Sequence, residues 1–284
     1  MLNLSSLRCI TPRVFNSRLL RLYSTTNPPA LQVNSTPLDH GSILTLSLDR
    51  PKARNAISLQ LLSELTDYVQ RLKTQHPSVA DVRCLIISST SDQAFCAGAD
   101  LKERKTFSPN QTNEFLATLN HTLTTLSSLE IPTISSVQGS AFGGGVELAL
   151  STDFRVLSET AELALTETRL AIVPGAGGTH RLPKLIGYTR ALDMILTGRR
   201  ISASEALNFG LANRVASSSD AEALLLAKTI CEGGPIAIRA AKQAVRGASP
   251  EWEQVAYSKV VNSKDKFEAL DAFANKRKPV FKGE

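Results

Sequence analysis

The chain has 284 residues, of which 42% are hydrophobic and 20% are charged. This composition is that of a globular protein long enough for one large domain or two small ones, and it excludes a short disulfide-held scaffold and a disordered acidic chain. No apolar run approaches the roughly 18 residues of a spanning helix, so no membrane association is expected. The four cysteines form no C-x-x-C pair, and neither a disulfide framework nor a thiolate metal site is predicted.

The formal charge of +6 comes largely from the N-terminus. Four arginines lie within the first 21 residues, and no Asp or Glu occurs before Asp39. This pattern is typical of a mitochondrial presequence, and Arg-Leu-Tyr-Ser at 21–24 resembles a matrix-processing site cleaved after Tyr23. We therefore expect a presequence over residues 1–23 and a location in the mitochondrial matrix. Without those four arginines, 28 basic residues face 26 acidic ones, which gives little support to nucleic-acid binding.

The elements are expected to begin after a linker over residues 24–39, which is rich in proline and polar side chains. In residues 43–48, leucines alternate with Thr and Ser, the pattern of a half-buried strand. Ser58 is placed to cap a helix that ends near residues 76–77. The elements expected next are strands over 83–89, 134–137 and 153–157 and helices over 112–129 and 143–150.

Short strands alternating with helices predict an α/β core over residues 40–195. The sequence then becomes mostly helical, which predicts a helical C-terminal region over 196–284. The candidate helices of that region cover residues 203–209, 221–231, 235–246 and 252–274.

Three glycine-rich stretches, residues 95–101, 139–147 and 174–179, stand out as places where backbone could approach a ligand closely. None of them fits a P-loop or a dinucleotide-binding turn, because the P-loop lysine and the third glycine of the dinucleotide motif are missing. The chain has no Gly-x-Ser-x-Gly elbow and no histidine pair at metal-binding spacing. Serine-hydrolase chemistry and metal catalysis are therefore not predicted.

Backbone N–H groups and carboxylates remain as candidate catalytic groups. Glycines 143–145 at the start of a helix would expose unpaired N–H groups, which can hold a developing oxyanion. Glu147 lies one turn into that helix, and Glu167 follows 20 residues later among apolar neighbours. Two carboxylates beside an oxyanion hole can share acid and base work on a carbonyl compound without a metal. By spacing alone, two surface glutamates remain the simpler interpretation.

The motifs resemble those of the crotonase superfamily, the enoyl-CoA hydratase/isomerase family, from about residue 40 to the C-terminus. The matching stretches, in order along the chain, are residues 50–56, 95–101, 139–147, 167–179 and 276–284. The resemblance implies an α/β fold in which ββα repeats form a spiral, followed by a helical C-terminal region that serves in trimerisation. A homotrimer, or a hexamer of paired trimers, is therefore expected.

The resemblance also implies roles for individual residues. The N–H groups of Ala99 and Gly144 would hold a thioester oxygen, and Glu147 and Glu167 would form the catalytic pair, with Glu167 favoured as the proton donor to C2. Residues 97–102 would line the CoA pocket, with Ala97 near the adenine. The expected substrate-binding residues are Ala97, Ala99, Asp100, Leu101, Lys102, Gly144 and Arg54. No metal and no separate cofactor are expected, since CoA is part of the substrate.

Family members that keep both glutamates are hydratases, so the resemblance implies hydration of a 2-enoyl-CoA thioester to a 3-hydroxyacyl-CoA. Residues 96–104, residues 167–174 and the Phe-Lys-Gly-Glu ending look most like the branch that acts on 3-methylglutaconyl-CoA in leucine degradation. Arg169 could pair with the extra carboxylate of that substrate, or form only a surface ion pair. A general short-chain hydratase of fatty-acid β-oxidation shares most of these features and stays open.

A second class of function, binding of AU-rich RNA, is known in that branch through a lysine-rich helix. The matching helix here, over residues 58–73, has only Arg71 and Lys73 as basic residues, and Glu64 and Asp67 oppose them. Phosphate binding needs accumulated positive charge. An RNA partner is therefore unlikely on the sequence, and an acyl-CoA thioester is the expected partner.

Overall fold

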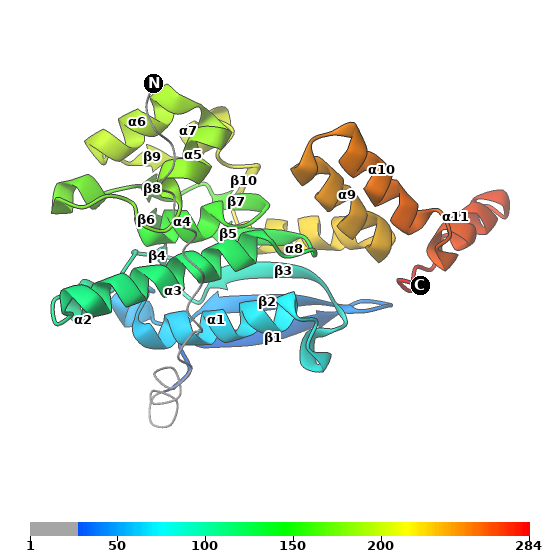
Figure 1. Cartoon of the computed structure of the whole chain (residues 1–284), viewed down its shortest axis with the longest axis horizontal. Helices are drawn as coiled ribbons and strands as arrows, with labels where there is room; N and C mark the ends of the chain where they lie inside the picture. The colour runs from blue at the N-terminus through cyan, green and yellow to red at the C-terminus, as the bar shows by residue number, and fades with distance from the viewer. Residues whose placement is uncertain (1–27) are drawn as a thin grey trace, which may run out of the picture.

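The computed structural model describes residues 28–284, so the presequence predicted over 1–23 lies outside the described residues. Two sheets are present (Figure 1). The six-stranded sheet has the order β1 (Leu31–Pro37), β2 (Ser42–Leu48), β3 (Val82–Ser89), β5 (Thr133–Val137), β7 (Phe154–Ser158) and β10 (Arg214–Ala216). The four-stranded sheet has the order β4 (Ala94–Cys96), β6 (Ser140–Phe142), β8 (Glu162–Ala164) and β9 (Ile201–Ser202).

Three successive ββα units build both sheets. In each unit the first strand (β3, β5 or β7) enters the six-stranded sheet and the second (β4, β6 or β8) enters the four-stranded sheet. The helices that follow these pairs are α2 (Leu101–Arg104) with α3 (Pro109–Ser127), α4 (Gly144–Leu150), and the 3-10 helix η4 (Glu167–Leu170) with α5 (Gly178–Ile186). All strand pairings between units are parallel. The expected spiral of ββα repeats is confirmed.

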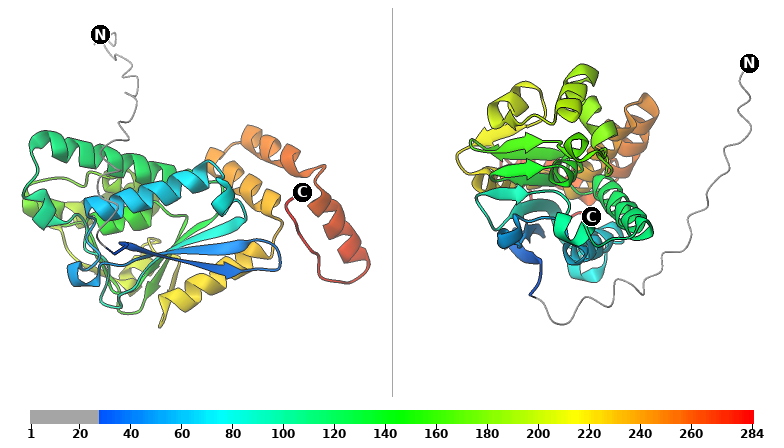
Figure 2. Two further views of the ribbon diagram at one scale, coloured as in Figure 1. Left: turned by 90° about the horizontal axis from the view of Figure 1, so that it is seen from below. Right: turned by 90° about the vertical axis from the view of Figure 1, so that its left-hand side faces the viewer.

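The predicted first helix is confirmed as α1 (Leu59–Lys73), which begins after Ser58, whose side chain accepts a hydrogen bond from Leu61 N. Helices α1 and α3 lie along one face of the six-stranded sheet, and α8 (Ser219–Cys231) covers the other face (Figures 1 and 2). Ile43 of β2 is fully buried in the cluster that α8 completes. The prediction of a half-buried strand over 43–48 is therefore wrong, because a helix far along the chain covers its second face.

Other differences concern element boundaries. The linker predicted over 24–39 contains β1, an edge strand that pairs antiparallel with β2 along its whole length. Its residues are mostly exposed, so they lack the apolar alternation that would have predicted a strand. Helix α3 begins at Pro109, three residues before its predicted start, because Ser108 caps it and proline is tolerated in the first turn.

The predicted change of character at residue 196 does not coincide with a break in the fold. Helix α5 precedes it, α6 (Tyr188–Thr197) spans it, and β10 follows it and pairs with β7 of the main sheet. The helix predicted over 252–274 is two helices, α10 (Pro250–Val260) and α11 (Lys264–Ala274). Ser263 interrupts it, since its side chain accepts from Lys266 N and caps α11. Helix α7 (Ala203–Asn208) matches its prediction closely.

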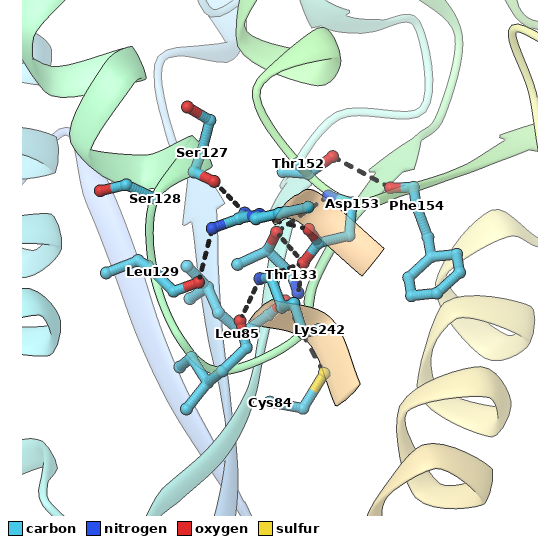
Figure 3. Close-up of polar contacts among 12 residues, drawn as sticks. Cys84, Leu85, Ser127, Ser128, Leu129, Thr133, Thr152, Asp153, Phe154 and Lys242 are labelled. Carbon is cyan, nitrogen blue, oxygen red and sulfur yellow. Dashed lines mark hydrogen bonds and ion pairs between the residues drawn. The ribbon is translucent and has the colours of Figure 1, made fainter. Parts of the chain in front are cut away.

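Helices α9 (Pro235–Gly247), α10 and α11 project from the sheets as a C-terminal arm (Figures 1 and 2). A buried cluster on α9 fixes its base: Lys242 Nζ donates to the Asp153 carboxylate and to Ile131 O (Figure 3). The same carboxylate accepts from Thr133 N at 2.8 Å. Arg246 donates to Asp153 Oδ1 at 3.3 Å. The Asp153 carboxylate therefore links two cations of α9 to the first residue of β5.

No helix between residues 28 and 284 combines the length and the apolar character that a membrane crossing needs.

Candidate active site

Two unpaired backbone N–H groups meet where β4 and β6 end. These strands are parallel neighbours, so the loops that follow them lie at the same edge of the sheet. Gly144 is the first residue of α4, and its N–H has no acceptor within the helix. A Cβ atom placed on Gly144 would lie 3.8 Å from Ala99 N. The N–H groups of Ala99 and Gly144 are therefore adjacent, as an oxyanion hole requires.

Close packing of α4 against β4 holds this arrangement in place. A Cβ atom on Gly145 would lie 2.2 Å from the carbonyl oxygen of Cys96, a separation that real Cβ atoms do not adopt. Gly145 therefore lets the start of α4 approach the strand that leads to Ala99. The glycine stretch singled out in the sequence thus permits this close approach.

We expect Gly145→Ala to lower the free energy of unfolding by about 3 kcal/mol, because the new methyl group meets backbone that cannot move aside. Denaturant unfolding followed by circular dichroism measures the change. Gly187→Ala is a useful comparison, because its positive φ of 82° strains the backbone while no atom lies within 4 Å of the new Cβ. An equal loss in both variants would contradict a steric role for Gly145.

Glu147 lies on α4 with its side chain buried, and the residue is only 3% exposed. Its Oε1 accepts hydrogen bonds from Ala176 N at 2.7 Å and Gly178 N at 2.9 Å. Burial raises the pKa of Glu147 above its ordinary value, although these two N–H groups and the charge of Arg181 act in the opposite direction. Two backbone N–H groups at the start of α5 therefore bind Oε1. The other carboxylate oxygen, Oε2, remains available to a ligand.

Glu167 begins η4, and the residue is 9% exposed. A Cβ atom at Gly143 would lie 3.1 Å from Glu167 Oε1, so this carboxylate lies against the turn that leads into α4. Its Oε2 is buried and has no hydrogen-bond partner. Burial raises the pKa of Glu167 to about 7, and the charge of Glu147 contributes to the rise. At neutral pH this carboxyl group is therefore protonated about half of the time.

The two glutamates have different environments within one site. Glu147 is held by two N–H donors that favour its ionised form, whereas Glu167 has a buried oxygen without a donor. Two carboxyl groups that differ in pKa can supply a base and an acid at the same pH. Beside the N–H groups of Ala99 and Gly144, the pair can act on the carbon atoms next to a carbonyl.

The loop that carries Ala99 is fixed by a second loop, residues 50–57. Ile57 N donates to Gly98 O at 2.7 Å, and Asp100 N donates to Ile57 O at 3.0 Å. The Asp100 carboxylate forms an ion pair with Arg50 Nη2 at 2.9 Å and caps α2 by accepting from the N–H groups of residues 102 and 103. Asp100 was predicted to bind substrate, and in the structure its carboxylate is occupied in holding the Ala99 loop.

Arg50 and Asn55 were not predicted as functional residues, although both lie in a stretch on which the family resemblance rests. Asn55 is fully buried at φ 54°, and its Oδ1 accepts from Arg50 N at 2.7 Å. Its Nδ2 donates to Ser89 Oγ at 2.7 Å. The available signal was Asn55 itself, the one short polar residue of the turn over residues 50–56, since asparagine tolerates positive φ better than most residues.

Arg50→Ala should lower the free energy of unfolding by about 3 kcal/mol, because it leaves Asp100 buried without its cation. It should also reduce kcat/KM about 50-fold, because the Ala99 N–H is no longer held in position. Denaturant unfolding and steady-state kinetics measure the two effects. Arg71→Ala, which breaks an exposed ion pair with Asp67 on α1, should change either quantity very little.

The remaining predicted residues surround this centre. Ala97 N donates to Arg54 O at 3.0 Å, so the two residues predicted near CoA lie side by side, and the side chains of Arg54 and Lys102 are exposed. Leu101 is 59% exposed next to Ala99. These residues are accessible to a large ligand that reaches the oxyanion hole from outside.

Arg169 is engaged elsewhere. Its Nε and Nη2 donate to the carbonyl oxygen of Thr197 at 3.0 and 2.7 Å, at the end of α6. It has no carboxylate partner among residues 28–284, so the surface ion pair that the sequence left open is not observed, and pairing with a substrate carboxylate stays a prediction. The structure therefore assigns Arg169 to the connection between η4 and α6.

Comparisons with known proteins identify the family of the chain. A family profile described as enoyl-CoA hydratase/isomerase matches residues 39–284. An enoyl-CoA isomerase/hydratase of Zymoseptoria tritici is 53% identical over 274 residues, covering 89% of this chain and 88% of that protein. A protein of Pyricularia oryzae named methylglutaconyl-CoA hydratase 1, mitochondrial, is 45% identical over 322 residues, covering 95% of this chain and 92% of that protein.

A solved structure is also similar: an enoyl-CoA hydratase from Bacillus anthracis superimposes with a TM-score of 0.84 at 40% identity, covering 90% of this chain and 100% of that one. Both sheets, the helices around them and most of the sequence are thus shared with proteins of one family. The chain belongs to the enoyl-CoA hydratase/isomerase family.

Proposed function

We propose that the protein adds water to a 2-enoyl-CoA thioester and forms a 3-hydroxyacyl-CoA. The thioester oxygen accepts hydrogen bonds from the N–H groups of Ala99 and Gly144, which draws electron density from C3. Each donor in such a hole contributes on the order of 3 kcal/mol to the stability of the transition state. Glu147 removes a proton from water as its oxygen bonds to C3, and Glu167 gives a proton to C2. No metal and no cofactor beyond the CoA of the substrate takes part.

The observation that carries this proposal is the buried, unpartnered Oε2 of Glu167. A folded protein rarely leaves a buried carboxylate oxygen without a donor. A carboxyl oxygen that contacts the reacting water and transfers the carboxyl proton to C2 needs to be free of other hydrogen-bond partners. The pKa of about 7 further supports a proton donor that works near neutral pH.

For the acyl group we propose 3-methylglutaconyl-CoA, an intermediate of leucine degradation. Support comes from the 45% identical mitochondrial relative of that name, and the mitochondrial matrix is the matching location. A straight-chain enoyl-CoA of β-oxidation is the alternative substrate. An isomerase activity is a second candidate, because the printed name of the 53% identical relative includes it.

We further propose that the protein assembles as a homotrimer or hexamer through its C-terminal arm. Large apolar side chains are exposed on α10 and α11, and Phe273 is 86% exposed. A monomer would leave this surface in water, and burial against a second copy of the chain would stabilise it. Sedimentation of the purified protein measures the assembly directly.

The test compares hydration of crotonyl-CoA and of 3-methylglutaconyl-CoA. The rate of each reaction is measured as the loss of the enoyl-thioester absorbance. A higher kcat/KM for 3-methylglutaconyl-CoA supports the proposed substrate, and a higher value for crotonyl-CoA makes the enzyme a general short-chain hydratase. Activity on neither, with CoA esters still binding, would contradict hydration and favour the isomerase.

A further inference from the structure

Arg104, the last residue of α2, is a partly buried cation without an acceptor. Its guanidinium lies over the ring of Phe115, 5.1 Å from the ring centre, and donates to no carboxylate, carbonyl or hydroxyl oxygen in the described part of the chain. Burial lowers the pKa of Arg104 below its ordinary value. Arg239 on α9 is the other partly buried arginine, within residues 28–284, that lacks a hydrogen-bonded acceptor.

A guanidinium has five N–H donors in a planar fork. Among the described residues, the buried polar side-chain atoms without a partner are Arg83 Nε and Glu167 Oε2, so the donors of Arg104 are in contact with solvent. Other partly buried arginines bind an acceptor within the chain: Arg50 binds Asp100, and Arg181 donates to Ala176 O at 2.8 Å. The fork of Arg104 is therefore available to an anion that enters from outside.

Arg104 lies on the segment that leads away from Ala99. It follows Ala99 by five residues and ends α2, the helix that begins two residues after Ala99. Leu116 follows Phe115 on α3. Its side chain would lie 3.1 Å from a Cβ atom placed on Gly175. That glycine precedes Ala176, whose N–H binds Glu147. Figure 1 shows α2 at the end of α3.

Aromatic side chains lie beside the guanidinium. The rings of Phe107 and Phe115 lie 6.0 Å apart, and Leu101, which is 59% exposed, begins the same helix as Arg104. Apolar side chains suit the carbon chain of an acyl group, and the phosphates of CoA find exposed cations nearer Ala97. A five-carbon acyl chain spans about 5 Å from its thioester carbon to its far end.

We propose that Arg104 binds a carboxylate at the far end of the acyl chain and so selects dicarboxylic acyl-CoA thioesters. This inference rests on the proposed acyl-CoA function, and it assigns recognition of the terminal carboxylate of the acyl chain to Arg104. A guanidinium pairs with a carboxylate through two parallel hydrogen bonds, which are strong where water is partly excluded. An acyl chain that ends in a methyl group leaves the fork of Arg104 empty, and this difference provides the selectivity.

The test uses binding of two unreactive saturated thioesters, glutaryl-CoA and butyryl-CoA, which differ by the terminal carboxylate. Isothermal titration calorimetry on the full chain compares the wild type with Arg104→Leu, Arg104→Lys and Lys105→Leu. Lys105 is exposed and neighbours Arg104, so its replacement removes the same charge without the buried fork. Circular dichroism verifies that each variant is folded.

We expect Arg104→Leu to weaken glutaryl-CoA binding about 100-fold and butyryl-CoA binding less than 3-fold. Arg104→Lys should restore part of the difference, and Lys105→Leu should change neither affinity by more than about 3-fold. An equal loss for both thioesters would overturn the proposal and indicate a contact with a CoA phosphate or a structural role. Unchanged affinities for both would overturn it as well.

These outcomes are separate from those of the hydration assay. Because glutaryl-CoA and butyryl-CoA do not react, the binding ratio reports on Arg104 even if the enzyme proves to be an isomerase. Failure of the hydration assay with a selective loss in Arg104→Leu would reject the proposed reaction and keep the inference. Hydration of 3-methylglutaconyl-CoA with no selective loss would do the opposite.

Discussion

Glu167→Gln should reduce kcat/KM for the hydrated thioester at least about 1,000-fold and, at pH 8, make the protein more stable than the wild type. The loss of activity follows from removal of the proton donor to C2, since general acid catalysis contributes 10²- to 10⁴-fold. The gain in stability follows from the unpartnered Oε2. A neutral amide in the same place no longer has to be ionised in a buried site.

The size and the pH dependence of the gain follow from the pKa of about 7. In the unfolded chain Glu167 regains its ordinary pKa near 4.5. Because the folded value is raised, ionisation costs stability as pH rises from about 4.5 to 7 and no further above that. The full difference corresponds to about 3 kcal/mol, which solvent at the mouth of the site reduces to about 1–2 kcal/mol.

Denaturant unfolding at pH 8 and pH 5 measures this difference. At pH 8 the free energy of unfolding of Glu167→Gln should exceed that of the wild type. At pH 5 the difference between the two free energies should be smaller. Glu159→Gln removes an exposed glutamate and should leave both kcat/KM and stability unchanged. A Glu167→Gln protein that is less stable than the wild type at pH 8 would mean that Oε2 has a partner in solution.

Much of this site could be predicted from the sequence, because its chemistry depends on local motifs. The glycines at 143–145 could be placed at the start of a helix from the sequence, as α4 confirms, and the resemblance assigned roles to Glu147 and Glu167 as an expectation. The Arg50–Asp100 pair could not be found in this way, because it joins residues fifty positions apart. Asp100 was assigned to the substrate for the same reason: a sequence shows a carboxylate but not the cation that occupies it.

The fold shows the same division. Alternation in β2 predicted a strand, yet its burial depends on α8, and the polar β1 is a strand only because β2 offers it a partner. Arg169 was singled out because it is near Glu167 in sequence, whereas Arg104, 63 residues before that glutamate, is a partly buried cation without a hydrogen-bonded acceptor among the described residues. Distance along the chain is thus a poor guide to which charge faces a ligand.

Glu147→Gln should also reduce kcat/KM about 1,000-fold, because an amide cannot take a proton from water. Its effect on stability should differ from that of Glu167→Gln. The amide oxygen can still accept from Ala176 N and Gly178 N, so the folded protein keeps these bonds in weaker form while it loses the cost of a buried charge. The two changes oppose each other, and the free energy of unfolding should stay within about 1 kcal/mol of the wild type.

Glu147→Ala separates these contributions, since it removes the acceptor of two buried N–H groups and should cost about 2–4 kcal/mol. The pH profile then assigns the roles within the pair. In the wild type kcat/KM should fall above about pH 7 as Glu167 loses its proton. The residual activity of Glu147→Gln should keep this alkaline limb, and that of Glu167→Gln should lack it. The reverse result would make Glu147 the acid and Glu167 the base, with the same oxyanion hole serving either direction of proton transfer.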